Sequence, residues 1–587
     1  MYRKCIVIPC ILTLVLAIRT LACASDSPAS FPGKIRLSVQ GSTEHRSTYY
    51  ADYLLALYYP KEEETLIFFN PKETIQDPSA EELNLGLGIR RIIAEKYILG
   101  VHFFYDKKHS HSRAWHYQRG YGLEFLSQAF DFRFNYYDPV NKPRVVNETY
   151  NFGQTNLIHY SDYEEPLEGF DIELGFPLRF KPLKTTRVYI GGYSYNSGLG
   201  KDKRGQRIRT ETNFFDWLSL DLTYNNSSSN EGEFIGGVRF TIPIEPGRLL
   251  QGKNPIHNAS RRPYIKERLF ERVVRDIDVQ TESSTKNDLA SDANGVIEMI
   301  YVDNTNNSGT EDGTLAHPYN TLAEALSSAR YAEGKYVYLF RGDGTSNGYA
   351  GEFTLLDNVI LWGSGYNGGY EGLPTSGYPI IDGGGGGAVI TLGNNDTIMG
   401  CQIQNADLGI FGTDVSTIIK YNRITGNSTD GIYLRSAGGA VISSQILGNT
   451  IYDNDGRGID IRSGATNASF VISGNTISGN TTSGIYITLT GNTAFNAKIS
   501  RNTIFNNADG VTVSGSSTNP VTIDLGGGGL LSEGYNSIYG NSNYNVDNSV
   551  DGLTIKAENN WWGQSQPSAA KFNGNVDYDP WLTFNPN

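Results

Sequence analysis

The sequence is poor in cysteine, the residue that cross-links many secreted chains. It has 4 Cys among 587 residues, and three of them lie before Ala24. Residues 1–24 have the pattern of a secretory signal peptide: a basic start, an apolar run and the small residues Ala22 and Ala24 at the cleavage site. Removal of this segment leaves Cys401 alone, so no internal disulfide can form, although the destination is oxidising.

Long apolar runs are scarce as well. The apolar stretch of the signal is too short to span a bilayer as a helix, which argues against its alternative interpretation as an uncleaved anchor. No later run reaches the length of about 20 residues that a spanning helix needs. If the mature chain lies in a membrane, we therefore expect a closed β-barrel, because open strand edges cannot face hydrocarbon. The net charge of −13 argues against a nucleic-acid partner.

Alternation of apolar and polar residues dominates the first half of the chain. Between Ala129 and Tyr137, aromatic residues occupy one face and Asp131, Arg133 and Asn135 occupy the other. A strand with a period of two has one apolar and one polar face. Aromatic-rich faces opposite faces of mixed charge are typical of a transmembrane barrel, which is apolar toward lipid and polar toward its lumen.

The same pattern predicts about twelve spanning strands, an even number as bacterial barrels require. They lie near residues 34–40, 49–59, 64–70, 83–91, 97–106, 115–125, 129–138, 168–179, 186–195, 206–215, 217–224 and 234–242. The longest gap, 141–168, is expected to be an outer loop. A large soluble β-sandwich or meander is the alternative, but the aromatic content and the signal peptide favour the barrel.

Four segments of this region carry a family resemblance: Leu83–Arg91, Tyr97–Asp106, Gly120–Phe125 and Asp162–Ile172. They are similar to the barrel domain of the intimin and invasin family, the inverse autotransporters. The resemblance covers about residues 30–280. It implies an outer-membrane barrel in contact with lipid, the outer-membrane insertion machinery as a partner, and a C-terminal passenger carried to the cell surface.

Residues 247–280 contain eight basic and four acidic side chains. Ile265, Leu269 and Val273 recur at helical spacing, which predicts a helix over 264–275. A basic thread fits a lumen with acidic inward residues, namely Asp131, Asp171, Glu173 and Asp221. An ordinary solvated linker helix is an equal alternative from the pattern alone. In the resembled family this segment runs through the pore as helix plus extended chain.

An internal repeat begins after residue 296, where Gly, Asn, Ser, Thr and Ile become abundant. Its marker asparagines recur at steps of 27, 26 and 27 residues: Asn422, Asn449, Asn475 and Asn502. Isoleucine lies three residues before and two residues after each marker, and a second asparagine lies five after. This frame predicts a solenoid with one coil per repeat, a stacked isoleucine core and a hydrogen-bonded asparagine ladder.

Two details of the repeat carry further expectations. A glycine precedes an apolar residue in each frame, at Gly431, Gly458, Gly484 and Gly510. We expect these glycines to permit a turn conformation that other residues disfavour. The asparagines could instead contact a ligand, but a structural ladder is the favoured interpretation.

The repeats and their flanks resemble the right-handed parallel β-helix of pectate-lyase-like proteins. The segment Tyr301–Ala325 is similar to the usual start of such helices, and Ala557–Leu582 is similar to their usual end. The resemblance covers about residues 296–587 and implies roughly ten coils.

Enzymes that cleave polysaccharides share this fold, so an activity has to be argued from a site. The passenger holds a single histidine, His317, and lacks the Gly-His-Gly turn of β-helix hydrolases. A calcium-dependent lyase needs carboxylates and a base, often arginine. Candidates for these roles are Arg435, Arg457, Arg462, Asp430, Asp453, Asp455 and Asp460. The repeat register places Asp453 and Asp455 near Asp430, but solvated turn residues are the favoured interpretation.

The sequence thus predicts an all-β protein of four parts. These are a signal peptide (1–24), an outer-membrane β-barrel (25–246), a pore-threading linker (247–295) with a flexible end after residue 280, and a right-handed parallel β-helix passenger (296–587). We expect display of the passenger outside the cell for adhesion or for recognition of a carbohydrate or protein. We assign no catalytic, cofactor-binding or metal-binding residue. A displayed polysaccharide lyase is the alternative, and a structural surface layer is a third possibility.

Overall fold

The computed structural model describes residues 33–44, 47–60, 64–76, 80–178, 180, 185–227, 232–244, 263–276, 278–438, 441–464, 467–490, 494–516 and 519–587. The predicted signal peptide and residues 247–262 of the predicted linker lie outside the described residues. The chain divides into two compact units, Met1–Asn147 with Ser161–Lys286 and Glu148–Tyr160 with Asn287–Asn587. Across the described parts of the chain, no helix is long and apolar enough to cross a membrane.

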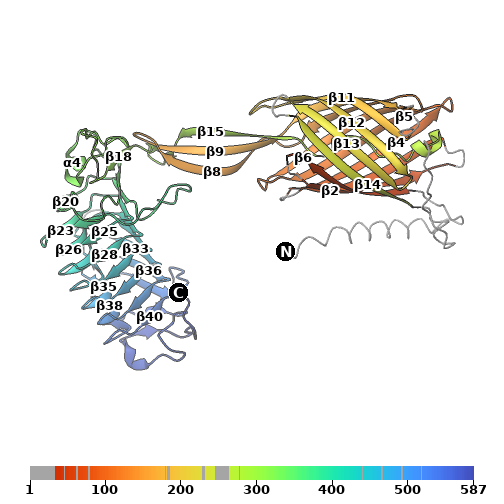
Figure 1. Cartoon of the computed structure of the whole chain (residues 1–587). Coiled ribbons are helices and arrows are strands. Elements are labelled where there is room, and N and C mark those ends of the chain that lie inside the picture. Colours follow the sequence, from red (N-terminus) through yellow and green to blue (C-terminus); the bar gives the residue numbers. More distant parts are fainter. Residues whose placement is uncertain are drawn as a thin grey trace. The chain divides into compact units, whose positions relative to one another are not determined.

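The first unit contains a closed barrel of twelve antiparallel strands (Figure 1). These strands are β1 (Gly33–Ser42), β2 (Ser47–Tyr58), β3 (Thr65–Gln76), β4 (Ala80–Ile93), β5 (Tyr97–His109), β6 (Trp115–Ser127), β7 (Asp131–Pro139), β10 (Glu168–Pro177), β11 (Thr186–Asn196), β12 (Lys203–Phe215), β13 (Leu218–Ser227) and β14 (Glu233–Ile244). Strand β14 pairs with β1 and closes the ring. The predicted barrel is confirmed, and the sandwich alternative is wrong.

The two faces of the barrel wall follow the period of two in the sequence. Asp131, Arg133 and Asn135 are buried, whereas Phe130 beside them is exposed on the outside. Strand β13 repeats the pattern, since Asp221 and Ser219 are buried and Leu222 is exposed. Exposed apolar side chains are stable on this surface only when lipid covers them.

The segment between β7 and β10 is a hairpin and not the predicted loop. Its strands are β8 (Arg144–Phe152) and β9 (Leu157–Pro166), and they form a three-stranded sheet of order β15-β9-β8. Strand β15 (Thr281–Leu289) occupies most of the stretch that we expected to be flexible, so that expectation is also wrong. The free edge of β9 offers unpaired backbone groups, and β15 satisfies them.

The second unit is a stack of parallel strands in three sheets, a parallel β-helix (Figure 1). The eleven-strand sheet contains β18 (Met299–Val302), β19 (Tyr336–Leu339), β21 (Ile360–Gly363), β24 (Asp396–Met399), β27 (Thr417–Lys420), β30 (Ile442–Leu447), β33 (Ala468–Ser473), β36 (Phe495–Ser500), β39 (Val521–Gly526), β42 (Ile555–Ala557) and β44 (Val576–Asp577). The nine-strand sheet contains β20 (Phe353–Thr354), β23 (Ala388–Thr391), β26 (Leu408–Thr413), β29 (Asp430–Arg435), β32 (Ile459–Ser463), β35 (Ser483–Leu489), β38 (Asp509–Gly515), β41 (Val546–Asn548) and β43 (Phe572–Asn573). The seven-strand sheet contains β22 (Ile380–Asp382), β25 (Gln402–Gln404), β28 (Arg423–Thr425), β31 (Thr450–Tyr452), β34 (Thr476–Ser478), β37 (Thr503–Phe505) and β40 (Ser537–Tyr539).

Short elements complete the described fold. They are α3 (Ile265–Arg268), β16 (Ser291–Asp292), β17 (Gly295–Val296), α4 (Leu322–Ser327) and η2 (Ala569–Lys571). Helix α4 begins with a capping box, in which Thr321 accepts a hydrogen bond from the Glu324 N–H and Glu324 accepts one in return.

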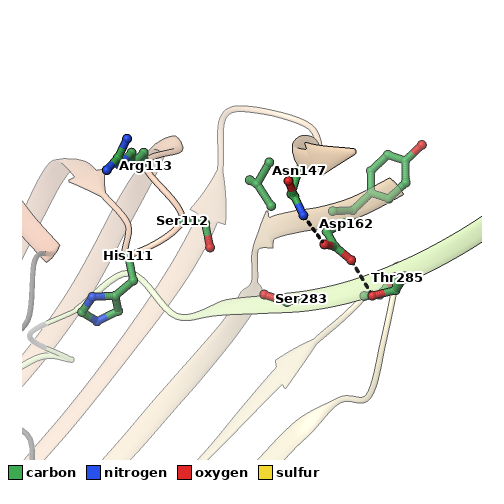
Figure 2. Close-up of a pocket in the computed structure, with 10 residues that line it drawn as sticks. His111, Ser112, Arg113, Asn147, Asp162, Ser283 and Thr285 are labelled. Carbon is green, nitrogen blue, oxygen red and sulfur yellow. Dashed lines mark hydrogen bonds between the residues drawn. The ribbon is translucent and has the colours of Figure 1, made fainter. Parts of the chain in front are cut away.

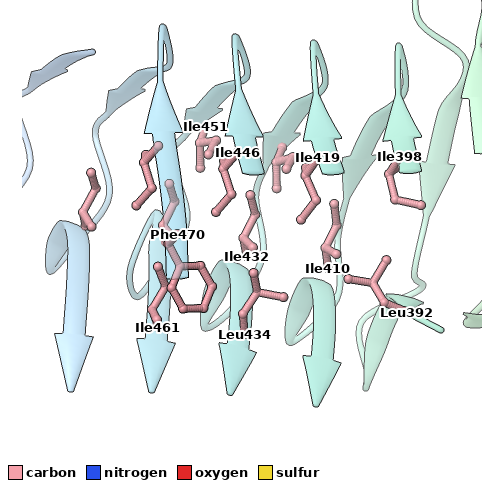
Figure 3. Close-up of a cluster of buried hydrophobic side chains, with 14 of the residues drawn as sticks. Leu392, Ile398, Ile410, Ile419, Ile432, Leu434, Ile446, Ile451, Ile461 and Phe470 are labelled. Carbon is pink, nitrogen blue, oxygen red and sulfur yellow. The ribbon is translucent and has the colours of Figure 1, made fainter. Parts of the chain in front are cut away.

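Isoleucines at equivalent positions of successive coils fill the passenger core (Figure 3). Ile398, Ile419 and Ile446 lie in register on neighbouring strands of the eleven-strand sheet and are fully buried. A fully buried isoleucine contributes about 1.5–3 kcal/mol. The predicted isoleucine core is confirmed.

The predicted asparagine ladder is confirmed. The backbone N–H and side-chain Nδ2 of Asn422 both donate to Asn449 Oδ1, at 2.9 and 3.1 Å. Asn449 repeats this arrangement with Asn475, and its Nδ2 also donates to the Ile419 carbonyl at 2.8 Å. A second ladder starts at Asn427. Each buried turn thereby satisfies its polar groups through the next coil.

The repeat glycines serve a different purpose from the one predicted. Gly431, Gly458, Gly484 and Gly510 all lack a positive φ. A Cβ on Gly458 would lie 2.7 Å from the Gly484 carbonyl oxygen and 3.0 Å from Asn480 Nδ2. These positions thus require glycine because the next coil lies too close, and the turn explanation is wrong.

Replacement of Asn449 by alanine tests the ladder. Two buried N–H groups of Asn422 lose their acceptor, so passenger stability should fall by about 2 kcal/mol or more. Chemical denaturation of the purified full-length protein, with the passenger followed by its protease resistance, measures the loss. Asn543→Ala, at an exposed asparagine of the same unit, is the matched control. Equal stability of both variants would contradict a stabilising ladder.

Candidate functional site

The barrel lumen contains the chain that follows the last barrel strand. Residues 263–276 and 278–280 run along it as the short helix α3 and then as extended chain. The regular helix ends at Arg268 and does not reach residue 275, so most of the predicted helix is wrong. Beyond it, the carbonyls of Leu269 and Glu271 accept hydrogen bonds from Arg90 of the barrel wall, at 2.8 and 2.6 Å. Contacts with the wall thus replace further helical turns.

Three linker arginines bind three different strands of the wall. One is Arg268, whose Nη2 lies 2.9 Å from Asp131 of β7. Arg272 lies 3.1 Å from Glu211 of β12. Arg275 makes two hydrogen bonds to Asp106 of β5, at 2.7 and 2.5 Å, and its guanidinium also lies 4.6 Å from the centre of the Phe104 ring. The linker arginines are therefore paired with three carboxylates of the barrel wall, Asp131, Glu211 and Asp106.

Near its end, the same linker segment carries two acidic residues, and these pair with basic residues of the barrel wall. Asp276 lies 2.5 Å from Arg207, and Asp278 lies 2.7 Å from Lys108. Lys108 also donates to the Val279 carbonyl at 2.7 Å. Each linker charge in these pairs therefore meets a wall charge of opposite sign, as buried ions require.

An apolar contact closes the part of the lumen near α3. Leu269 and Phe270 belong to one buried cluster with wall residues. The wall residues of this cluster are Leu54, Ala56, Leu66, Phe68, Ile92, Ile98 and Leu126. The segment is thus held by both apolar packing and ion pairs along its path.

Two of the four acidic lumen residues named from the sequence contact the linker. Asp131 binds Arg268, and Asp221 lies 3.6 Å from Arg272. The other two brace the wall itself, since Glu173 pairs with Arg209 at 2.9 Å and Asp171 accepts a hydrogen bond from Tyr137 at 2.5 Å. Sequence reasoning missed Asp106, Glu211 and Arg90, although Asp106 and Arg90 are buried on the inward face and Glu211 meets the linker from it. A solvated linker helix does not describe this segment.

The passenger candidates for lyase chemistry form an ion-pair cluster on the nine-strand sheet. Asp430 accepts a hydrogen bond from the Arg457 N–H at 2.9 Å. Asp460 is buried between Arg457 and Arg462, at 3.5 and 2.9 Å. Burial raises the pKa of the Asp430 carboxyl, against the opposing hydrogen bond from the Arg457 backbone.

The other named acidic residues do not complete a cation site. Asp453 and Asp455 are exposed, and Asp453 lies in a turn with φ of 52°. Over the described residues, no group of three or more His, Cys, Asp or Glu could hold a metal ion. Arg435 is exposed and donates to Thr413 at 3.0 Å.

A polar hollow of about 570 Å³ lies beside the barrel strands (Figure 2). Its lining includes His111, Arg113 and Asp162. The Asp162 carboxylate already accepts hydrogen bonds from Asn147 at 3.1 Å and Thr285 at 2.6 Å, as Figure 2 shows. The Asp162 carboxylate therefore joins β15 to the hairpin.

A closed barrel that encloses its own downstream chain, followed by a parallel β-helix, is the arrangement expected of an outer-membrane autotransporter. The family comparison agrees with this class. Residues 23–199 match the family model described as "Inverse autotransporter, beta-domain", and residues 304–569 match "Protein of unknown function (DUF1565)". The protein is thus of the inverse-autotransporter type, with an outer-membrane barrel and an extracellular β-helix passenger. Lipid and the outer-membrane insertion machinery are its implied partners.

Solved structures give weaker similarities. A chain described as "Unveiling the Mechanism Behind the in-meso Crystallization of Membrane Proteins" is 18% identical, with a TM-score of 0.33 over 43% of this chain and 100% of that chain. The β-domain of the Bordetella autotransporter BrkA is 6% identical, with a TM-score of 0.19 over 36% and 98%. The translocator domain of NalP from Neisseria meningitidis is 10% identical, with a TM-score of 0.19 over 39% and 95%. Such values support no inference about function, and no curated protein matches the sequence.

Replacement of Arg275 by alanine tests whether the ion pairs hold the linker segment in the barrel lumen. Asp106 would remain buried without its partner, which costs about 3–5 kcal/mol and should loosen the segment in the lumen. We expect a higher ion conductance of the purified protein in planar bilayers. Arg144→Ala, at an exposed arginine of β8, should conduct like the unmodified protein. A closed pore in both variants would contradict this role of the pair.

Proposed function

We propose that the barrel anchors the passenger at the cell surface for adhesion, and that the passenger binds an acidic carbohydrate there. The observation that carries the proposal is a row of aromatic and arginine side chains on the outer face of the nine-strand sheet. Phe411, Tyr433 and Tyr486 share one register line across four neighbouring strands, and the buried Asp460 occupies the position between Tyr433 and Tyr486. They alternate with residues that point into the passenger core.

Each aromatic ring of this row lies next to a guanidinium group. Arg462 lies 4.8 Å from the Tyr433 ring centre, and Arg457 lies 4.3 Å from the Tyr486 ring centre. The rings of Phe411 and Tyr433 are stacked at 5.6 Å. All three rings are partly exposed.

The chemistry of this row suits an acidic sugar chain. Aromatic rings are large, rigid and amphipathic, so they provide flat surfaces for sugar rings. Arginine forms paired hydrogen bonds with carboxylate and with phosphate-like anions. The stack repeats at about 4.8 Å per coil, so a linear ligand can contact several coils at once.

A displayed polysaccharide lyase is the second candidate, favoured by one observation. The cluster of Asp430, Asp460 and Arg457 has a buried carboxylate oxygen, Asp460 Oδ1, without a hydrogen-bond partner. The combination of an autotransporter domain with a domain of undetermined activity favours a role without catalysis. The two candidates share the ligand class and differ in what happens to the ligand.

The double variant Tyr433→Ala/Arg435→Ala tests the proposed row, because the Arg435 guanidinium lies 5.7 Å from the centre of the Phe411 ring. Its affinity for carboxylated or sulfated polysaccharides should fall roughly tenfold or more, since the loss of about 1.4 kcal/mol is tenfold in Kd. Full-length protein displayed on cells is measured against a panel of polygalacturonate, hyaluronan, heparin and neutral dextran. The matched control is Arg501→Ala, because Arg501 also lies over a tyrosine, Tyr535, at 5.5 Å but belongs to a different turn.

Three other results would contradict the proposal. Binding that is equal for both variants would remove the row from recognition. Binding to proteins but to none of the glycans would make the passenger a protein adhesin. Shortened, unsaturated products from an acidic polysaccharide would identify the lyase instead.

A further inference from the structure

The first strands of the passenger are apolar on both faces, unlike the later ones. In β18, Ile300 points into the β-helix core, and Met299 and Tyr301 belong to a second buried cluster on the opposite face. The same division holds in β19 and β21, where Tyr338 and Trp362 belong to the second cluster. The outward cluster consists of Leu157, Ala290, Ile297, Met299, Tyr301, Tyr336, Tyr338, Ile360, Trp362, Leu373 and Met399. Beyond β24 the outward residues are mostly polar, as in β33 with Ser469 and Ser473.

The tip of the β8–β9 hairpin covers this second apolar face. Leu157 is fully buried in the cluster, and Phe152 packs against it. The Phe152 ring lies 4.6 Å from Tyr338 and 6.1 Å from Trp362. Tyr150 packs against the same cluster and contacts Tyr370, with ring centres 4.9 Å apart. This tip, Glu148–Tyr160, is part of the passenger's compact unit although its sequence lies between two barrel strands.

Backbone hydrogen bonds fix the register of the tip on the first coil. The Met299 N–H donates to the Thr155 carbonyl at 2.8 Å, and the Ala290 N–H donates to the Leu157 carbonyl at 2.8 Å. The Leu315 N–H donates to the Gln154 carbonyl at 2.9 Å, and the Tyr150 N–H donates to the Glu371 carbonyl at 2.8 Å. A side-chain bond is added by Tyr301, whose hydroxyl donates to the Gly153 carbonyl at 2.8 Å. Backbone pairing on several sides leaves the tip one position relative to these strands.

We propose that the hairpin tip Glu148–Tyr160 is an intramolecular folding template, on which the first coils of the passenger assemble before the later coils stack. The proposal adds a function to the barrel sequence, because this segment precedes the passenger in the chain. It is independent of what the passenger binds.

The reason lies in how a solenoid folds. Each later coil adds to a finished neighbour, which supplies strand edges and an apolar surface. The first coil has no such neighbour. Its formation therefore loses chain conformational entropy while gaining the fewest strand hydrogen bonds and apolar contacts. The tip supplies an aromatic surface and backbone partners at this position, and the outward apolar cluster that it packs against ends at Met399 of β24. Stacking then proceeds from the first coil toward Asn587.

The test compares refolding rates of full-length protein. Protein unfolded in denaturant is diluted into detergent, and the return of the passenger to protease resistance is timed. Barrel folding is read separately from its heat-sensitive migration in gels. In the variant Phe152→Ala/Leu157→Ala we expect passenger refolding to slow by roughly tenfold or more, because contacts already present in the first step affect the folding rate.

Two controls separate a template from a stabilising contact. Val145→Ala changes an exposed apolar residue of the same hairpin and should refold at the normal rate. Phe470→Ala removes a buried aromatic ring from a middle coil and should mainly accelerate unfolding. If Phe152→Ala/Leu157→Ala prevents barrel folding, Tyr338→Ser disrupts the same contact from the passenger side and carries the same expectation. A normal refolding rate in the hairpin variant, or in Tyr338→Ser, would overturn the template even if the passenger unfolded faster.

Discussion

Unpaired strand edges are the constraint on which this architecture depends. In hydrocarbon an unpaired backbone group has no water to bind, so the pairing of β14 with β1 is a condition for the barrel to lie in lipid at all. Outside lipid the same requirement is met coil by coil, with each strand completing the edge of the one before. The asparagine ladder extends this pairing into the turns, where Asn449 and its counterparts replace the missing strand partners.

The polar lumen imposes a second requirement. Inward side chains of both signs cannot form an apolar core, so whatever fills the lumen has to match them. The linker does so in order along its length, with Arg268, Arg272 and Arg275 on wall carboxylates and then Asp276 and Asp278 on wall cations. Buried ions are costly unless each is paired, and this matching gives the segment one position in the lumen. The segment that fills the lumen is therefore also the segment that leads from the last barrel strand to the passenger.

The sequence predicts best what its local period determines. Alternation located the twelve barrel strands, and the spaced repeat located the core and the ladder. Local alternation could not locate β8 or β15, because these polar segments are strands only where they pair with β9. The end of α3 depends on Arg90, which is distant in sequence. The ladder rungs Asn536 and Asn560 follow at steps of 34 and 24 residues, so a fixed period misses them. Among the acidic lumen residues, alternation identified the inward side but not which of them would meet a linker arginine.

We propose that the passenger reaches the cell surface through its own barrel. The most direct measurement places one epitope tag after Asn587 and another after the predicted signal cleavage site at Ala24, and exposes intact cells to protease. Under export, we expect the C-terminal tag to be removed while the N-terminal tag stays protected. Protection of both tags until the outer membrane is opened would contradict it, because the β-helix would then lie in the periplasm.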